Sequence, residues 1–366
     1  MGESAARAAR IMHFVTGGFS GATQVAVDLA LAAQRDGMEV LLVLRKKRNT
    51  SRERVQALRD QGLDVRVVSN WWHAWTVREL RKLIRAWKPD VFFAHGFSDH
   101  IWGRRAAVAE QVPHIFHVEH NSRERYTPRR LQQALALAPH TQASIGVSEG
   151  VRQSLIARGF PEDRCIAIPN GIDLRQFPSA LQPGQWAQRD AKIVMVARFA
   201  RQKDHQTLLQ ALALLRNKGI RPLLELAGSG SARLRRKVQK LVQQLGLQEQ
   251  VRFLGNVSDL PQRLAGTQIF VLATHWEGMP LALVEAMAAG CACVASDVPG
   301  VRGVFRDGEE GILVPHADAV SLAQALARLL ADCAYAQSLG HAAHARAFGS
   351  YGQDRMWHQY KALCLS

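Results

Sequence analysis

The chain has 366 residues, 47% of them hydrophobic, which is more than one compact core normally holds and indicates two globular domains. No apolar run approaches the roughly 18 residues of a transmembrane helix, and the start, MGESAARAAR, lacks the apolar core of a signal peptide, so we expect a cytoplasmic protein. The formal net charge of +16 suits an anionic ligand, an anionic membrane surface or nucleic acid. Because no DNA- or RNA-binding signature and no zinc-finger spacing is present, we expect no nucleic-acid partner, and a basic nucleic-acid-binding protein stays only an alternative.

The first half of the chain alternates apolar, strand-like runs with amphipathic helical patterns. The strand-like runs are 11–15, 39–44, 64–68, 91–95, 114–120, 143–148 and 165–169. The pattern ATQVAVDLALAAQRDG between the first two runs predicts a helix that ends at Gly37. This alternation is typical of parallel strands joined by crossover helices, as in a doubly wound α/β domain.

The composition changes over residues 178–191, PSALQPGQWAQRDA, which we interpret as a linker. Beyond it the alternation of strand and helix restarts with KIVMVAR and continues to GILVP. We therefore expect one Rossmann-like domain over residues 1–180, a second over 186–345, and a terminal helical region over 346–366. Ligands of such domains bind outside the carboxyl ends of the strands, in a cleft that we expect the two domains to share.

The stretch EGMPLALVE contains two carboxylates, Glu277 and Glu285, around the start of a short apolar helix. Pro280 fits the first helical position, which places Glu277 and Gly278 in the loop before the helix and Glu285 in its second turn. The backbone N–H groups at that helix end would form an anion site. The alternative is that both carboxylates are ordinary exposed charges near a helix N-terminus.

The turn GGFSG joins the first strand to the first helix and allows the backbone at Gly17 and Gly18 to approach a phosphate or sugar closely. Its spacing is not that of a dinucleotide-binding fingerprint, and the second strand ends in Arg45, Lys46 and Lys47 in place of an acidic residue. An oxidoreductase that uses the 2′-phosphorylated nicotinamide cofactor would tolerate that basic end, and it stays an alternative.

Three further side chains follow predicted strands and are candidates for chemistry. Arg198 and Lys203 lie where the first strand of the second domain opens into a loop, and two cations there would clamp a diphosphate, although both would also be acceptable as exposed surface charges. His120 follows a strand of the first domain and would either contact a sugar hydroxyl or be an internally bonded polar residue. No Asp-x-Asp pair is present, so no metal is expected and the leaving group would be stabilised by Arg, Lys and backbone N–H groups.

Several blocks of the sequence together resemble the retaining glycosyltransferases of family 4, which have the GT-B fold. These blocks are GVSEGVRQSLIARGF, IAIPNGID, VMVARFARQKDHQTLLQAL, LAGSG, VRFLGNV and THWEGMPLALVEAMAAGCACVASDVPG. They occur in the family's order, and the likeness runs from GGFSG to GILVP. The resemblance implies an α/β protein of two Rossmann-like, doubly wound domains that face each other across a cleft.

The resemblance also implies the roles of individual residues. The catalytic group would be Arg198 and Lys203 on the diphosphate, Glu277 positioning the donor sugar, and His120 contacting that sugar. The donor-binding group would be Gly17, Gly18, Asn256, Val257, Gly278, Met279, Pro280, Leu281 and Glu285. Family members often carry a Glu where this chain has Gly303, which puts a contact from that loop in doubt. The family's final helix crosses back to the first domain, as the segment 348–365 would do here.

The implied activity is transfer of a hexosyl or N-acetylhexosaminyl group, with retention and without a metal or other cofactor, from a nucleotide-diphosphate sugar to a hydroxyl of a glycan or lipid-linked acceptor. Synthesis of lipopolysaccharide or another cell-surface polysaccharide is the expected context. The segment NWWHAWTVRELRKLIRAWK, residues 70–88, combines tryptophans with a basic helix. It would either lie on an anionic membrane at the inner face of the cytoplasmic membrane or serve as an ordinary crossover helix packed on the sheet.

Overall fold

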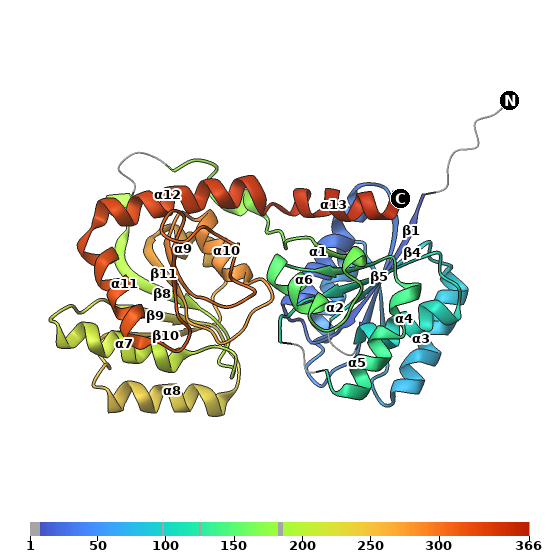
Figure 1. The fold of residues 1–366 in the computed structure, drawn as a ribbon, viewed down its shortest axis with the longest axis horizontal. Coiled ribbons are helices and arrows are strands. Elements are labelled where there is room, and N and C mark those ends of the chain that lie inside the picture. The colour runs from blue at the N-terminus through green and yellow to red at the C-terminus, as the bar shows by residue number, and fades with distance from the viewer. Residues whose placement is uncertain (1–7, 97–98, 124–125, 182–185, 366) are drawn as a thin grey trace. The chain divides into compact units, whose positions relative to one another are not determined.

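The computed structural model describes residues 8–96, 99–123, 126–181 and 186–365. The first seven residues, where no signal peptide is expected, and residues 182–185 of the expected linker lie outside the described residues. The chain divides into two compact units, unit 1 with residues 1–171 and 353–366, and unit 2 with residues 172–352. Each unit contains one parallel sheet with helices packed on it, which confirms the predicted α/β class (Figure 1).

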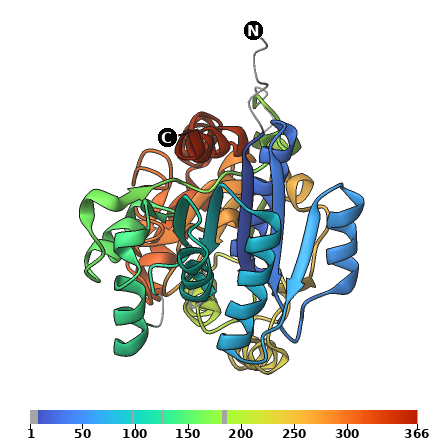
Figure 2. The same ribbon diagram turned by 90° about the vertical axis from the view of Figure 1, so that its right-hand side faces the viewer.

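Unit 1 contains a seven-stranded sheet in the order β3-β2-β1-β4-β5-β6-β7. Its strands are β1 (Arg10–Thr16), β2 (Glu39–Arg45), β3 (Asp64–Val68), β4 (Val91–His95), β5 (His114–Glu119), β6 (Ala143–Gly146) and β7 (Cys165–Ala167). Its helices are α1 (Gly21–Arg35), α2 (Arg52–Asp60), α3 (His73–Trp87), α4 (Asp99–Ala109), α5 (Pro128–Leu135), α6 (Glu149–Ile156) and α13 (Gln353–Leu365). All strand pairs are parallel, so the carboxyl ends of the strands share one edge of the sheet (Figure 2).

The apolar stripe of α3 packs in the core of unit 1. Leu80 and Ile84 are fully buried against Phe92 and Ala94 of β4 and the helix α4, and Val77 and Trp87 pack at the edge of the same cluster. This is the ordinary role of a crossover helix in a doubly wound domain. The stripe is therefore occupied within the protein, whereas the large hydrophobic side chains of Trp71, Trp72 and Trp75, at the start of α3, are exposed.

The terminal helix α13 belongs to unit 1, although it follows the whole of unit 2 in sequence. It lies beside α1 (Figure 1), and its buried side chains are Met356, Trp357, Tyr360 and Cys364. Trp357 Nε1 donates a hydrogen bond of 2.7 Å to Asp36 Oδ2, directly after α1. The change between units falls between Gly352 and Gln353.

Unit 2 contains a six-stranded parallel sheet in the order β10-β9-β8-β11-β12-β13. Its strands are β8 (Asp190–Val196), β9 (Leu224–Ala227), β10 (Val251–Gly255), β11 (Thr267–Leu272), β12 (Ala292–Ser296) and β13 (Ile312–Val314). Its helices are α7 (His205–Asn217), α8 (Ala232–Gln244), α9 (Leu260–Ala265), α10 (Leu281–Ala288), α11 (Ala319–Ala331) and α12 (Cys333–Ser350). Because β8 and β11 are neighbours at the centre of this sheet, the loops that follow them meet at its carboxyl edge.

Candidate active site

The centre of the site in unit 2 is the buried carboxylate of Glu277, in the loop between β11 and α10. Its Oε1 accepts hydrogen bonds from Lys203 Nζ and from Thr274 Oγ1, the latter at 2.7 Å, and its Oε2 accepts one of 2.9 Å from Gln202 Nε2. Glu277 is 5% exposed. A carboxylate this buried needs a cation and hydrogen-bond donors, and the loops after β8 and β11 supply both.

Backbone hydrogen bonds lock the same two loops together. His275 N–H donates to the carbonyl of Gln202 at 2.9 Å, and Asp204 N–H donates to that of Ala273 at 3.0 Å. The side chain of Asp204 then caps α7 by accepting from Thr207 N–H at 3.1 Å. The backbone of Lys203 is thus fixed on one side by the hydrogen bonds between the two loops and on the other by the capped helix α7. This backbone position allows the Lys203 amine to bond Glu277.

The helix α10 begins one residue later than predicted. Pro280 is its N-cap, with φ −80° and ψ 104°, and Leu281 is the first helical residue. The Pro280 carbonyl accepts from Leu283 N–H and Val284 N–H at 3.1 and 3.3 Å, as an N-cap carbonyl does. Pro280 is therefore the last residue of the loop and not the first residue of the helix. Glu277, Gly278 and Met279 lie in the loop before the helix, as predicted.

A third loop, after β12, packs directly against the backbone of the Glu277 loop. A Cβ atom added to Gly300 would lie 2.2 Å from the Glu277 carbonyl oxygen and 2.4 Å from that of Gly278. Only glycine permits this approach of two backbones. The hydroxyl of Ser296 in the same region accepts from Thr274 N–H at 3.0 Å, so β12 helps to position both ends of the Glu277 loop.

Glu285 lies half-buried in the second turn of α10. Its surroundings are mostly apolar, and burial raises the pKa of its carboxyl to about 7. None of the described residues forms a hydrogen bond or ion pair with its carboxyl group, although its backbone carbonyl accepts from Ala289 N–H within the helix. The two carboxylates of EGMPLALVE therefore differ: Glu277 is bonded on both oxygens, whereas Glu285 has unused acceptor capacity.

The remaining predicted residues of unit 2 lie at the carboxyl ends of β8 and β10, which β9 separates in the sheet. Arg198 follows β8 and is exposed, and Asn256 and Val257 follow β10, the edge strand. Gly228 and Gly230, after β9, approach the backbone of Ala197 and Phe199 so closely that a Cβ atom on either would lie under 3 Å from it. The structure brings Lys203 and Glu277 into contact.

In unit 1 the first two glycines of the GGFSG turn have different surroundings. Gly17 donates its N–H to the Arg45 carbonyl at 2.8 Å, and a Cβ atom there would lie 2.8 Å from that oxygen. At Gly18 a Cβ atom would meet nothing closer than 3.7 Å, so packing within unit 1 does not require glycine there. Phe19 has φ +47°, a strained conformation for a bulky side chain.

Arg45, at the end of β2, belongs to an internal network, whereas Lys46 after it is exposed. Arg45 is buried, donates to Asp99 Oδ1 at 2.5 Å, and bonds His73 Nδ1 at 2.8 Å. A buried guanidinium held by a carboxylate does not reach a ligand phosphate. Of the three cations at this end of β2, Arg45 is therefore not available to a 2′-phosphorylated dinucleotide.

His120 is half-buried directly after β5, and its Nε2 lies 3.1 Å from Nδ1 of His95. His95 Nε2 in turn lies 3.0 Å from Nδ1 of His13. Burial lowers the pKa of both His13 and His120 to about 3, so these rings are neutral at physiological pH. The sequence placed His13 and His95 in strands but did not show that they form a chain with His120.

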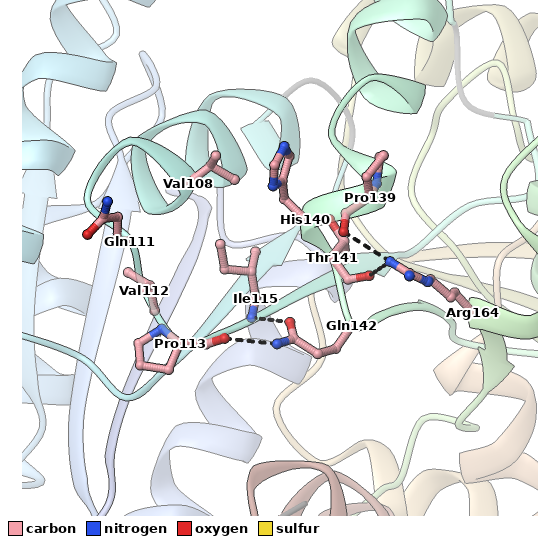
Figure 3. Close-up of a pocket in the computed structure, with 10 residues that line it drawn as sticks. All are labelled: Val108, Gln111, Val112, Pro113, Ile115, Pro139, His140, Thr141, Gln142 and Arg164. Carbon is pink, nitrogen blue, oxygen red and sulfur yellow. Dashed lines mark hydrogen bonds between the residues drawn. The ribbon is translucent and has the colours of Figure 1, made fainter.

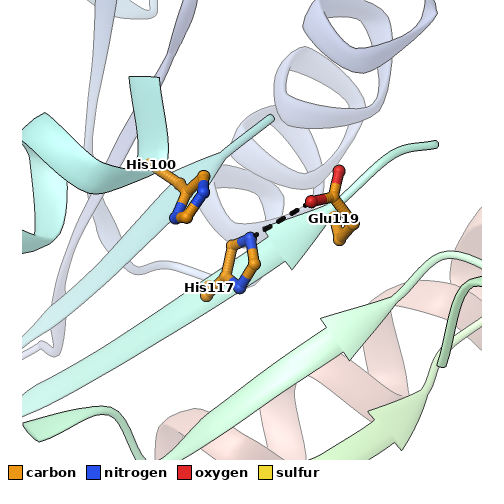
Figure 4. A group of neighbouring side chains, drawn as sticks. All are labelled: His100, His117 and Glu119. Carbon is orange, nitrogen blue, oxygen red and sulfur yellow. Dashed lines mark ion pairs between the residues drawn. The ribbon is translucent and has the colours of Figure 1, made fainter. Parts of the chain in front are cut away.

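A second polar cluster lies on the other face of β5 and consists of His100, His117 and Glu119 (Figure 4), whose potential ligand atoms all lie within 4.8 Å of one another. The rings of His100 and His117 are stacked, with centroids 3.9 Å apart, and the buried guanidinium of Arg104 bonds His100 Nδ1 at 3.1 Å. Tyr126 O–H lies 2.8 Å from His100 Nε2 and donates to Glu119 Oε2 at 3.1 Å. Stacked rings beside a buried cation do not suit a metal ion.

A surface hollow of unit 1 lies near the starts of β5 and β6, away from the carboxyl ends (Figure 3). It is lined by residues including Pro113, Ile115 and Arg164 and has a volume of about 820 Å³. Gln142 bonds the Ile115 N–H and the Pro113 carbonyl across it, at 2.7 and 2.8 Å. These contacts hold the strand starts together, and ligands of this fold class bind at the opposite edge.

Comparison with solved structures defines the class of the protein. HepE of Anabaena, solved in complex with UDP, superimposes with a TM-score of 0.84 over 97% of this chain and 98% of HepE, at 19% sequence identity. A glycosyltransferase from Rickettsia africae gives the same TM-score over 98% of both chains, at 17% identity. The fold is therefore GT-B, the two-domain Rossmann-like fold of glycosyltransferases.

The family follows from the sequence. Residues 178–346 match the model of glycosyl transferases group 1, and residues 19–176 match that of glycosyltransferase family 4. The chain belongs to this family of glycosyltransferases, which confirms the resemblance. Similar proteins include the lipopolysaccharide core biosynthesis glycosyltransferase LpsE of Rhizobium meliloti, 26% identical over 98% of this chain and 99% of LpsE. An Escherichia coli UDP-Gal:alpha-D-GlcNAc-diphosphoundecaprenol alpha-1,3-galactosyltransferase is 27% identical over 69% of each chain.

Proposed function

We propose that the protein transfers a hexosyl or N-acetylhexosaminyl group, with retention, from a nucleotide-diphosphate sugar to a hydroxyl of a glycan or glycolipid acceptor. The context would be synthesis of lipopolysaccharide or another cell-surface polysaccharide. The observation that carries this proposal is the bonded carboxylate of Glu277 beside the N-terminus of α10, in a chain that belongs to a glycosyltransferase family. The names of LpsE and of the Escherichia coli enzyme support a glycolipid acceptor.

The donor would bind unit 2 through complementary charge. Arg198 and Lys203 would hold the diphosphate, together with the backbone N–H groups of Gly278, Met279 and Leu281 at the start of α10. Glu285 has the unused acceptor oxygens that a ribose needs for its two hydroxyls, and Asn256 and Val257 would lie near the base. With two cations and a helix end to stabilise the leaving diphosphate, the reaction would need no metal.

The bonding of Glu277 favours a positioning role over nucleophilic attack. Both of its oxygens already accept hydrogen bonds, and Lys203 stabilises its negative charge. Departure of the diphosphate would leave an oxocarbenium-like sugar, which the acceptor hydroxyl attacks from the same face while a phosphate oxygen takes its proton. Gly18 and His120 would contact the donor sugar, as the family resemblance implies.

A thermal-shift screen with UDP, GDP and ADP tests the donor class. A nucleoside diphosphate at a hundredfold excess over its Kd would raise the melting temperature of unit 2, residues 172–352, by about 5–10 °C, because ligand binding stabilises the folded state. The same response in EDTA would support metal-free binding. Stabilisation by a nicotinamide dinucleotide alone, or salt-dependent retention on DNA, would replace the proposal with one of the two alternatives.

We further propose that unit 1 docks on the anionic inner face of the cytoplasmic membrane through the start of the 70–88 segment. Trp71, Trp72 and Trp75 are 90%, 76% and 49% exposed. None of the helices in the described part of the chain is long and apolar enough to span a bilayer. The apolar stripe of α3 is buried in the core, so this helix does not lie flat on the membrane. We propose that the tryptophans at its start insert into the membrane surface instead.

Charge at this corner matches an anionic surface. The Lys46 N–H donates to the Val68 carbonyl at 2.9 Å, so the run Lys46, Lys47, Arg48 lies beside the loop that carries the tryptophans. Tryptophan at an interface with basic residues beside it is the pattern of a membrane-surface protein. Both elements lie at the carboxyl edge of the sheet, where an acceptor of this fold class binds, so a lipid-linked acceptor would be taken directly from the bilayer.

Vesicle co-sedimentation tests this docking. We expect binding to phosphatidylglycerol vesicles, little binding to phosphatidylcholine, and a loss of about tenfold or more in Trp71→Ser/Trp72→Ser, since each buried tryptophan is worth more than 1.4 kcal/mol. Val320→Ser, which removes an exposed apolar residue of unit 2, is the matched control and should bind normally. No vesicle binding at low salt overturns the docking, and retention on a glycan column instead would assign the tryptophans to sugar stacking.

A further inference from the structure

Three histidines form a hydrogen-bonded chain across three neighbouring strands of unit 1. His13 in β1 bonds His95 in β4, and His95 bonds His120 after β5, with ring-nitrogen distances of 3.0 and 3.1 Å. In the sheet register His13 pairs with Phe93 and His95 with Val118, so each step moves one strand across and two residues toward the carboxyl edge. Positions two apart on a strand face the same side, which places all three rings on one face of the sheet.

Because the three rings are neutral, all of them must donate their hydrogen bonds in the same direction along the chain. A neutral imidazole has one N–H donor and one bare acceptor nitrogen, so an N–H···N chain fixes every tautomer once one is fixed. In one direction His13 donates from Nδ1 to His95 Nε2, His95 donates from Nδ1 to His120 Nε2, and His120 keeps its proton on Nδ1. In the other direction His120 donates from Nε2, and the chain ends with a proton on His13 Nε2.

The inner end of the chain decides between these directions. His13 is fully buried, and its Nε2 has no hydrogen-bond partner among the described residues. The second direction would leave a buried N–H without an acceptor, and such orphaned donors are rarer in proteins than orphaned acceptors. His13 also stacks on Phe93, with ring centroids 5.1 Å apart, which fixes the plane of its ring.

We infer that His13 and His95 are positioning residues that hold His120 in the Nδ1–H tautomer. His95 occupies Nε2 of His120 by donating to it, and Nδ1–H is then the group that His120 presents outside the chain. None of the described residues hydrogen-bonds His120 Nδ1. On the proposed function, this N–H donates to an oxygen of the sugar, and it does so without the cost of selecting a tautomer when the sugar arrives.

The tautomer itself can be observed without any substrate. In protein labelled with ¹⁵N-histidine, two-bond ¹H–¹⁵N correlation spectra distinguish a protonated from a bare ring nitrogen, and His120→Gln identifies the His120 signals by their loss. We expect His120 to be protonated at Nδ1 and bare at Nε2 from pH 6 to 8. Protonation at Nε2 overturns the inference, whatever the enzyme's activity.

Substitution of His95 separates a positioning role from a structural one. His95→Phe removes the donor, so His120 should move to the Nε2–H form and turnover should fall about three- to tenfold, the equivalent of one hydrogen bond, with nucleoside diphosphate affinity unchanged. His95→Asn, whose amide Nδ2 replaces the donating Nδ1, should restore both the tautomer and turnover. His117→Phe, a buried histidine of β5 outside the chain, should change neither. A turnover loss in His95→Phe without a tautomer change, or an equal loss in His117→Phe, contradicts the inference, and thermal stabilisation by UDP reports separately on the proposed function.

Discussion

The carboxyl group of Glu285 stays protonated to a higher pH in the folded protein than in the unfolded chain. Burial raises its pKa from 4.5 to about 7, so unfolding releases a proton between these values and the group's contribution to stability falls as the pH rises from about 4.5 to 7. Glu285→Gln has no charge to bury. We expect it to match the wild type near pH 5 and to exceed it by about 1–3 kcal/mol in the free energy of unfolding at pH 8, measured by urea titration.

The same substitution should weaken nucleotide binding, because an amide replaces the acceptor oxygens proposed for the ribose. Glu249→Gln, at an exposed position of unit 2, is the control and should change neither the pH profile nor the affinity. A Glu285→Gln protein with wild-type pH dependence would show that the carboxyl is ionised and satisfied in the free protein.

Lys203 and Glu277 form a buried ion pair. The effect on stability of replacing one of them should therefore depend on whether the other is present. Lys203→Met would leave the Glu277 carboxylate buried without the lysine charge and should destabilise the protein by about 3 kcal/mol or more. Lys203→Met/Glu277→Gln should recover most of this loss in a double-mutant cycle of urea unfolding. A double variant no more stable than Lys203→Met would show that the pair is not coupled.

In a transfer assay Lys203→Ala should reduce turnover far more than nucleotide affinity, as expected for a charge that stabilises the departing diphosphate.

At the scale of elements, the loop after β12 determines where the Glu277 loop lies. Gly300→Ala would bring Cβ against backbone carbonyls, which cannot rotate away, so the loop before α10 must shift. A displacement of about 1 Å is enough to cost a hundredfold in catalysis, and we expect a loss of that order in transfer with a smaller loss of nucleotide binding.

Gly349→Ala in α12 is the matched control for that substitution. Its Cβ would meet nothing within 4 Å, and alanine should stabilise the helix by about 0.5–1 kcal/mol without affecting transfer. Wild-type transfer by Gly300→Ala would show that the Glu277 loop tolerates movement.

The elements themselves were largely predictable because strands and helices alternate with distinct periods. Runs such as EVLLVL and KIVMVAR are buried strands flanked by amphipathic helices, and both sheets are parallel as that pattern indicates. The start of α10 was placed one residue early because proline is acceptable both as N-cap and as first helical residue, and only ψ distinguishes the two. The fate of the basic, tryptophan-rich α3 depended on which face met the sheet, and that face was the stripe of Leu80 and Ile84.

The contacts within the sites could not be predicted, because they depend on strand order. His13 and His95 lie 82 positions apart and meet only because β4 is placed next to β1. Gln202 reaches Glu277 because β8 and β11 are neighbours, whereas Thr274 lies only three residues before Glu277 in the same loop. Both residues belong to the sequence blocks ARQKD and THWEG that pointed to the site. A motif thus located the region, but the fold selected the partners.

At the scale of the whole molecule, unit 1 is completed by the last residues of the chain. Removing residues 353–366 would take Met356, Trp357, Tyr360 and Cys364 out of unit 1 and remove the Trp357 bond to Asp36. We expect this truncation to speed hydrogen exchange in β1 and α1 while leaving the core strands β8 and β11 protected. Leu365→Ser, which changes an exposed side chain of the same helix, should leave exchange unaltered. Faster exchange in β8 after truncation would contradict a role confined to unit 1.

The chain enters unit 2 after Gly171 and leaves it before Gln353, and these two crossings are adjacent. Ile172 forms a β-bridge with Gly352, and the Ile172 N–H donates to the Tyr351 carbonyl at 2.8 Å. The first and last residues of unit 2 are therefore hydrogen-bonded neighbours, so the unit begins and ends at one place in the structure. A gene encoding a different unit 2 would need only one pair of neighbouring junctions to be compatible, so recombination there would exchange the whole of unit 2 and leave every strand of unit 1 untouched.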